Sequence, residues 1–409
     1  MRGLKQNLVK EGVKVKVTLR VPMAAALLST AASAFAASID QTKLDELTHA
    51  VEPRVIEWPQ DIHQHPELSN REVRTAKLVA DHLKRLGLEV RTGIAHNGVT
   101  AFLQGGLPRP TIALHADMDA LPITEKMDVP FRSTVTSMYR GQTIGVMHAC
   151  GHDVHTAVLM GVAQLMLKEG VFDMHPPKVV FALHVQAEMR VGEISMRAGP
   201  FMAASGSWRM EVLGKQSHGA RPWCVGADRQ RAADSGEPSG RYHAESGGVT
   251  VGAIHSGVRF NIVPDRAELI GTIRSFDPKQ REAMLASMDG IVQNTATANG
   301  ATATFRIEPG SNPVLVNDPD LTEKMAPTLM RMAGEGNMHL APLITGAEDF
   351  AFFAQKVPSM YFRVGVTPAD RDTATAPSNH SDYFYVDEKA VPIALRAMTQ
   401  VAVDYLAGP

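Results

Sequence analysis

The chain has 409 residues, 44% of them hydrophobic and 21% charged, with a formal net charge of −2. This length is too great for one ordinary core and predicts two domains, and the composition is that of a soluble globular protein. The near-zero charge gives no electrostatic basis for binding nucleic acid or an anionic membrane.

The N-terminus has the pattern of an export signal. A basic stretch ends at Arg20, an apolar run spans 21–28, and Ala34-Phe35-Ala36 supplies small residues before a cleavage point. We therefore expect a signal peptide over 1–36, no membrane span after its removal, and a periplasmic or secreted protein. Translation from an internal Met, an uncleaved anchor or a disordered tail are the alternatives.

Helical and strand patterns then alternate. Apolar spacing predicts helices over 42–60 and from Asn70 to Gly87, and strands at 88–91, 99–103, 111–114, 143–146 and 179–183. Such alternation is typical of an α/β sheet. Polar residues at the carboxyl ends of three of these strands, at 115–122, 147–156 and 184, should converge on one site.

The pattern changes near Gly199. Alternating strands with one helix, 279–297, predict a smaller α+β insert over about 199–308. Helices at 318–332 and 387–405 and a strand at 359–366 follow. We expect a signal peptide (1–36), a catalytic α/β domain in two parts (37–198 and 309–409), and a lid between them (199–308).

The segment from Met147 to Thr156 holds three histidines, one cysteine and one aspartate around a glycine. Side chains of these types gather where a borderline metal ion is held. Solvated loop histidines beside a buried cysteine are the alternative. A disulfide between Cys150 and Cys224 is the less favoured use of the two cysteines.

The chain resembles the M20 metallopeptidase family in its amidohydrolase branch, which includes hippurate hydrolase and the auxin-conjugate hydrolases. The resemblance covers about 44–409. It is carried by His65-Pro66-Glu67, Asp117-Met118-Asp119-Ala120-Leu121-Pro122, His148-Ala149-Cys150-Gly151-His152-Asp153, Phe260-Asn261-Ile262-Val263-Pro264-Asp265, Gly271-Thr272-Ile273-Arg274, Glu348-Asp349-Phe350 and His380-Ser381. It implies a catalytic α/β domain with a central mixed sheet, interrupted by a lid through which the protein forms a homodimer.

The resemblance also implies roles for individual residues. Two divalent ions (Mn, Zn, Co or Ni) would be held by Cys150, His152, His184 and His380, and Asp117 would orient a metal-bound histidine. In the lid, His218 would polarise the scissile carbonyl group of a partner's substrate, and Asn261 and Arg274 would bind a substrate carboxylate. His115 is a candidate additional ligand.

One part of the family pattern is missing. The family's catalytic base is the first of two adjacent glutamates, and the second of them binds metal. No paired glutamates occur in this chain. Where that segment belongs, only the short stretch 168–178 separates Leu167 from Val179. Roughly 30–40 residues, enough for a strand and a helix, are expected to be deleted. Glu348 is the one candidate substitute for the base.

A second anomaly is the segment 224–247, which contains no Leu, Ile, Met or Phe and cannot form an amphipathic lid helix. Compensating frameshifts in the gene are one hypothesis for it. The sequence thus predicts a metal-dependent amidohydrolase for N-acyl amino acids or similar small amides, with impaired activity. A non-catalytic binding protein of the same fold and a degenerate chain that scarcely folds are the alternatives.

Overall fold

The computed structural model describes residues 41–103, 110–169, 177–220 and 248–408. The expected signal peptide and the anomalous segment 224–247 lie outside these residues. All of the described residues belong to one compact unit, Ser38–Pro409. None of the helices in the described residues is long and apolar enough to cross a membrane.

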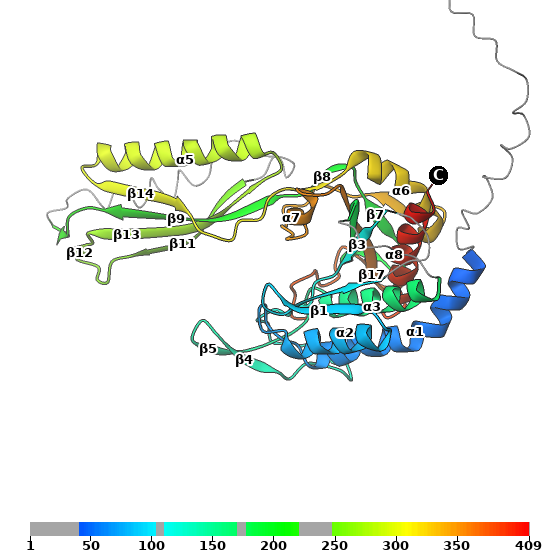
Figure 1. Cartoon of the computed structure of the whole chain (residues 1–409). Helices are drawn as coiled ribbons and strands as arrows, with labels where there is room; N and C mark the ends of the chain where they lie inside the picture. The colour runs from blue at the N-terminus through cyan, green and yellow to red at the C-terminus, as the bar shows by residue number, and fades with distance from the viewer. Residues whose placement is uncertain (1–40, 104–109, 170–176, 221–247, 409) are drawn as a thin grey trace, which may run out of the picture. The chain divides into compact units, whose positions relative to one another are not determined.

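A five-stranded mixed sheet forms the centre of the structure (Figure 1). Its strands, in spatial order, are β16 (Met338–Leu340), β7 (Ile194–Met196), β17 (Ser359–Thr367), β6 (Val179–Arg190) and β3 (Ile112–His115). β3, β6 and β17 run parallel, and β7 is antiparallel to β17. The predicted α/β class with a central mixed sheet is confirmed.

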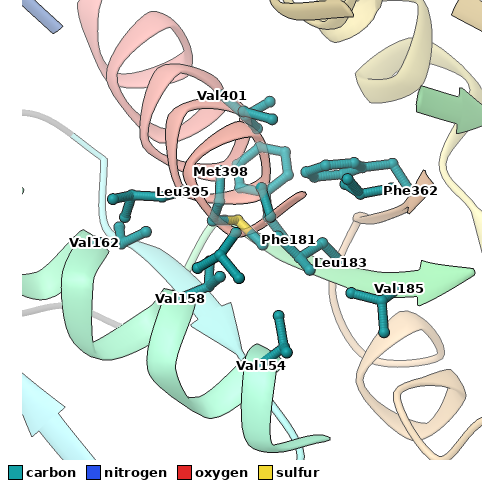
Figure 2. Close-up of a cluster of buried hydrophobic side chains, with 14 of the residues drawn as sticks. Val154, Val158, Val162, Phe181, Leu183, Val185, Phe362, Leu395, Met398 and Val401 are labelled. Atoms are coloured by element: carbon teal, nitrogen blue, oxygen red, sulfur yellow. The ribbon is translucent and has the colours of Figure 1, made fainter. Parts of the chain in front are cut away.

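Within the described ranges, four helices pack on one face of this sheet: α1 (Gln41–Gln64), α3 (His152–Glu169), α6 (Pro319–Ala333) and α8 (Ala390–Ala407). Alternate residues of β6, from Phe181 to Val185, and Phe362 of β17 point toward α3 and α8 (Figure 2). Because successive side chains of a strand point to opposite faces, His184 and Arg363 lie on the other side of the sheet.

That other face carries a second, smaller core. Phe201, Phe350 and Tyr361 are its largest side chains, and all three are buried. They come from β8 (Gly199–Met202), from the residue before α7 (Ala351–Ala354), and from β17. β8 pairs with β15 (Leu315–Asn317) next to this core. Here the sheet presents His184 beside Tyr361, with ring centroids 6.2 Å apart.

Two hairpins lie outside the central sheet. β1 (Glu89–Ile94) pairs with β2 (Gly98–Phe102) beside helix α2 (Val73–Arg85), and β4 (Thr136–Tyr139) pairs with β5 (Gln142–Gly145). The apolar run at 143–146 overlaps β5, which belongs to a hairpin outside the central sheet. The polar residues that follow this run still converge with those that follow β3 and β6, because Cys150 and His152 lie close to His184 and Asp117.

The insert forms its own antiparallel sheet, in the order β11 (Gly248–Ser256), β13 (Arg266–Ser275), β9 (Ala204–Leu213) and β14 (Thr302–Ile307). Helix α5 (Pro278–Ala298) packs on it around Trp208 and Leu269 (Figure 1). Asp277 caps this helix by accepting a hydrogen bond from the Lys279 amide. A short pair, β10 (Ser217–His218) and β12 (Ile262–Val263), completes the insert. The domain boundaries at 198/199 and 308/309 stay predictions.

Candidate metal centre

The centre is built on the tight turn that enters α3. Gly151 has φ of +83°, and a Cβ atom added there would lie 2.3 Å from Cγ2 of Val185. Only glycine accommodates both the left-handed backbone and this close approach to β6. The helix begins at His152, so the turn presents Cys150 and His152 together against the end of β6.

Three imidazoles surround the Cys150 sulfur atom. His184 Nε2 lies 3.4 Å from Sγ, and a ligand atom of His152 lies within 4.8 Å of both. His380, whose backbone amide donates to the Ala149 carbonyl oxygen at 2.7 Å, is close enough to interact with the thiol. The structure therefore brings together all four residues that the resemblance implied as ligands. These residues come from the α3 turn, β6 and the loop before α8, and they are far apart in the sequence.

The three rings change the acidity of the thiol. Burial by itself raises the pKa of Cys150, but the adjacent His184, His152 and His380 outweigh it and hold this pKa well below 9. A thiolate is the form of cysteine that binds metal ions.

Two of the candidate ligand histidines are held in orientation by contacts at their Nδ1 atoms. His184 Nδ1 lies 2.6 Å from the Val185 carbonyl oxygen, so its Nδ1–H donates there and Nε2 is left facing the sulfur. His152 Nδ1 lies 2.9 Å from both Oδ1 and the backbone oxygen of Asp119. A carboxylate behind a metal-binding imidazole fixes the ring and raises its basicity.

Asp117 was expected to orient a metal-bound histidine. In the structure its closest histidine contact is with His115, and Asp119 contacts the candidate ligand His152. The Oδ1 atom of Asp117 lies 2.9 Å from His115 Nε2, and its Oδ2 is 3.9 Å from His152 Nε2. The orienting contact to His152 comes from Asp119, which sequence reasoning missed. The sequence Asp117-Met118-Asp119 could have indicated this role, because it places a second carboxylate directly after β3.

His155 is a further residue that the sequence did not single out. Its Nε2 accepts the Val185 amide at 3.0 Å, so the proton resides on Nδ1, which faces Asp117 Oδ2 at 3.9 Å. Burial lowers the pKa of His155 to about 4, which keeps the ring neutral. His155 Nδ1 has no hydrogen-bond partner in the described residues. With Nε2 accepting the Val185 amide and the proton on Nδ1, neither nitrogen offers a free lone pair to an ion.

Glu348, the candidate substitute for the base, is buried on the same side of the sheet. Its Oε2 lies 3.1 Å from the Tyr361 hydroxyl group. Burial, followed by the negative charges of Asp117 and Asp349, raises the pKa of Glu348 well above 4.5. A carboxyl group whose pKa is raised in this way gives up its proton less readily than an ordinary glutamate, which does not favour a role as a resting general base.

A buried ionic cluster supports the turn from the side of α1. His63 lies between Asp153 Oδ2 (2.8 Å) and Glu125 Oε1 (3.2 Å). Burial disfavours the charged ring, but the two carboxylates overcome this and raise the pKa of His63 from 6.5 to about 10. The neighbouring His148 is 1% exposed, and neither of its ring nitrogens has a hydrogen-bond partner in the described residues. Sequence reasoning assigned no role to this cluster.

The structure places the three expected lid residues in two locations. His218 pairs with Ile262 across β10 and β12, and the Gly219 amide donates to the Asn261 carbonyl oxygen at 2.9 Å, so His218 and Asn261 are neighbours. Arg274 lies at the opposite end of β13, opposite Ser205 of β9, and burial lowers its pKa. At about 3.3 Å per residue, β13 separates Arg274 from Asn261 by roughly 26 Å.

The donor set fits a divalent ion. One ligand atom each from Cys150, His152 and His184 lies within 4.8 Å of the others, and a thiolate with imidazoles is a donor set typical of zinc and cobalt. His115, Asp117 and Asp349 form a second such group. The segment that would carry the paired glutamates belongs between α3, which ends at Glu169, and β6, which begins at Val179. The intervening chain is shorter than an average helix.

Comparisons with known proteins agree with this geometry. Residues 113–404 match the model of the family described as Peptidase family M20/M25/M40. The chain is 32% identical to thermostable carboxypeptidase 2 of Saccharolobus solfataricus, over 89% of this chain and 98% of that protein. It is 28% identical to N-acetylcysteine deacetylase of Bacillus subtilis, over 87% and 97% of the two chains.

A solved structure shares the fold. It is a Bacillus subtilis protein described as a dinuclear metal-binding peptidase of the M20 family, with a TM-score of 0.73 and 27% identity over 88% of this chain and 99% of that one.

Proposed function

The chain belongs to the M20/M25/M40 peptidase family, and from this membership we propose that it descends from metal-dependent amidohydrolases that cleave the C–N bond of N-acyl amino acids or similar small amides. The observation that carries the proposal is the convergence of His152, His184 and His380 on the Cys150 thiol. The similarity to a deacetylase of N-acetylcysteine supports an N-acyl amino acid as the substrate class.

In this proposal Cys150, His152, His184 and His380 hold divalent metal, with Mn, Zn, Co and Ni as the candidate ions. A bound ion would lower the pKa of a water molecule and polarise the scissile carbonyl group. Asp119 holds the His152 ring, and the Val185 carbonyl group holds the His184 ring, so both nitrogens that face the thiol are fixed in advance. His218, Asn261 and Arg274 are proposed to contact substrate from the lid.

Arg274 lies near the carboxyl end of β13, whereas Asn261 precedes β12, beyond the other end of that strand. Because the length of β13 separates them, one chain cannot bring both to the same carboxylate. A homodimer through the lid, in which one subunit lends His218 and Asn261 to the other, meets this requirement. Export by the signal at 1–36, and thus a periplasmic or secreted location, is part of the same proposal.

A specific observation favours a second candidate function. The chain contains no paired glutamates, and burial and nearby carboxylates raise the pKa of Glu348, the candidate substitute for the base. With no carboxylate base, acid–base catalysis that is typically worth about 10²–10⁴-fold is missing. A non-catalytic protein that binds metal and ligand with the same fold would result.

One experiment separates the two candidates. The purified full chain is loaded with Mn²⁺, Co²⁺ or Zn²⁺, and its metal content, its binding of hippurate by calorimetry and its hydrolysis of hippurate and N-acetyl amino acids are measured. Stoichiometric metal with hydrolysis that is lost in Cys150→Ala supports the amidohydrolase. Metal and hippurate binding with no turnover supports the binding protein. A chain that takes up no metal contradicts both.

A further inference from the structure

Arg363, in the middle of β17, is buried without a counter-ion. Its exposed fraction is 5%, and its Nε atom is buried with no hydrogen-bond partner in the described residues. The nearest acceptor for NH2 is the Met202 sulfur atom at 3.5 Å, and the guanidinium lies 5.4 Å from the centre of the Phe201 ring. A thioether is a weak acceptor, so the charge is left almost uncompensated.

Several other arginines of the protein are paired. Arg74 NH2 lies 2.7 Å and 2.8 Å from the two carboxylate oxygens of Asp61, and Arg396 lies 2.9 Å from Asp45. These side chains are also more exposed than Arg363. In the part of the chain that the structure describes, no carboxylate forms an ion pair with Arg363. Burial of an unpaired charge is costly, and such a group is retained where a ligand supplies the opposite charge.

The register of the sheet places Arg363 at the candidate metal centre. Arg363 of β17 is the direct partner of His184 of β6, and the two strands are parallel. Paired residues of neighbouring strands project from the same face. Figure 2 shows the neighbouring residues along the two strands, Phe362, Leu183 and Val185, on the opposite face, toward α3 and α8. The guanidinium and the His184 imidazole therefore stand side by side.

The acidic side chains of the centre are engaged elsewhere. Asp117 Oδ1 contacts His115, and Asp119 Oδ1 contacts His152. Glu348 Oε2 accepts a hydrogen bond from the Tyr361 hydroxyl group at 3.1 Å. None of the three is placed to neutralise Arg363.

We propose that Arg363 binds the carboxylate that forms from the scissile carbonyl group, which is the acyl half of the product. When the amide is hydrolysed, the water oxygen bonds to the carbonyl carbon and the C–N bond breaks. The nitrogen takes both protons of the water and leaves as an ammonium group, and the acyl half leaves as a carboxylate. A guanidinium donates two parallel hydrogen bonds to such a group. The choice of this carboxylate rests on the proposed function, whereas the existence of an anion site beside His184 does not.

The test uses Arg363→Met in the metal-loaded full chain, with two readouts. Calorimetry with benzoate and acetate should show at least tenfold weaker binding in the variant. Binding of neutral benzamide should be unchanged. Denaturation without ligand should show equal or higher stability, because an unpaired buried charge has been replaced by an apolar side chain of similar length. Arg74→Met is the matched control, and it should lose stability and keep its benzoate affinity.

The opposite pattern overturns the proposal. If Arg363→Met is destabilised as Arg74→Met is, with unchanged benzoate affinity, Arg363 is a structural residue. If the variant loses affinity for glycine or inorganic phosphate but not for benzoate, the assignment to the acyl half is wrong. Arg363→Lys, which keeps the charge, should retain part of the benzoate affinity even if the Met variant does not fold. Arg363-dependent benzoate binding without amide turnover would contradict the amidohydrolase, favour the non-catalytic binding protein and leave the anion site standing.

Discussion

The carboxylate of Asp119 holds the ring of His152, with Oδ1 2.9 Å from Nδ1. This contact leaves Nε2 as the nitrogen that faces Cys150, so the tautomer of a candidate ligand is set by its neighbour. We expect Asp119→Ala to weaken binding of Zn²⁺ or Co²⁺ about 10–100-fold, as measured by competition with a chelator. Asp289→Ala, on the exposed side of α5, should have no effect. Equal affinity in the two variants would contradict the role of Asp119.

The thiol of Cys150 should give the bound metal a distinctive spectrum. Cobalt bound by a thiolate has a sulfur-to-metal charge-transfer absorption in the near ultraviolet, and Cys150 is the one cysteine that the described residues place near three imidazoles. We expect this absorption in the wild-type chain and in Cys224→Ser, and its loss in Cys150→Ser. Persistence of the band in Cys150→Ser would show that the sulfur of Cys150 is not a ligand.

Gly151 couples the turn to the sheet. Its φ of +83° and the 2.3 Å approach of an added Cβ to Val185 mean that Gly151→Ala must strain the backbone and displace β6. The left-handed conformation alone costs about 1–2 kcal/mol for an alanine. We expect at least this loss in the free energy of unfolding, together with weaker metal binding. Gly141→Ala, at a φ of +81° in open space, is the control that carries the strain without the clash.

The ion cluster around His63 predicts a dependence of stability on pH. The pKa of His63 is raised from 6.5 to about 10 because Asp153 and Glu125 outweigh the cost of burial. The unfolded chain loses this proton above about pH 6.5, and the folded chain keeps it until about pH 10. The stabilisation is therefore complete below pH 6.5 and is lost as the pH rises to 10.

We test this dependence with His63→Asn. The variant leaves two buried carboxylates without a cation, which should cost about 3 kcal/mol at pH 6. Urea denaturation of both chains from pH 6 to pH 10 should show the difference between them shrinking toward pH 10. A difference that stays constant over this range would show that His63 does not carry its charge in the folded protein.

The proposed sharing of lid residues between the two subunits of a dimer can be tested with mixed dimers. His218 and Asn261 are neighbours, while Arg274 lies at the other end of β13. Mixed dimers of Asn261→Ala and Arg274→Ala chains should contain one intact site and recover hippurate binding that neither variant shows by itself. Sedimentation of the wild-type chain should show a dimer. Full hippurate affinity in the Asn261→Ala homodimer would exclude this sharing.

Much of the secondary structure follows from local patterns. The helices at 42–60, 279–297 and 318–332 correspond to α1, α5 and α6, because apolar spacing, Asp277 and Asp318 caps and the following prolines act within a few residues. The strand at 143–146 exists but lies in a hairpin and not in the central sheet. Periodicity identifies a strand, but the partner of that strand depends on residues far away in the sequence.

The features of the metal centre can likewise be divided into those that are visible in the sequence and those that depend on the fold. Residue types and their order could be read directly from the amino-acid pattern: Cys150 and His152 around Gly151, with His184 after an apolar strand and no paired glutamates anywhere in the chain. The folded structure was needed to show that Asp119 orients His152, that burial raises the pKa of Glu348, and that Arg363 stands unpaired next to His184. These properties depend on burial and on distances between separate strands, and a linear pattern contains neither.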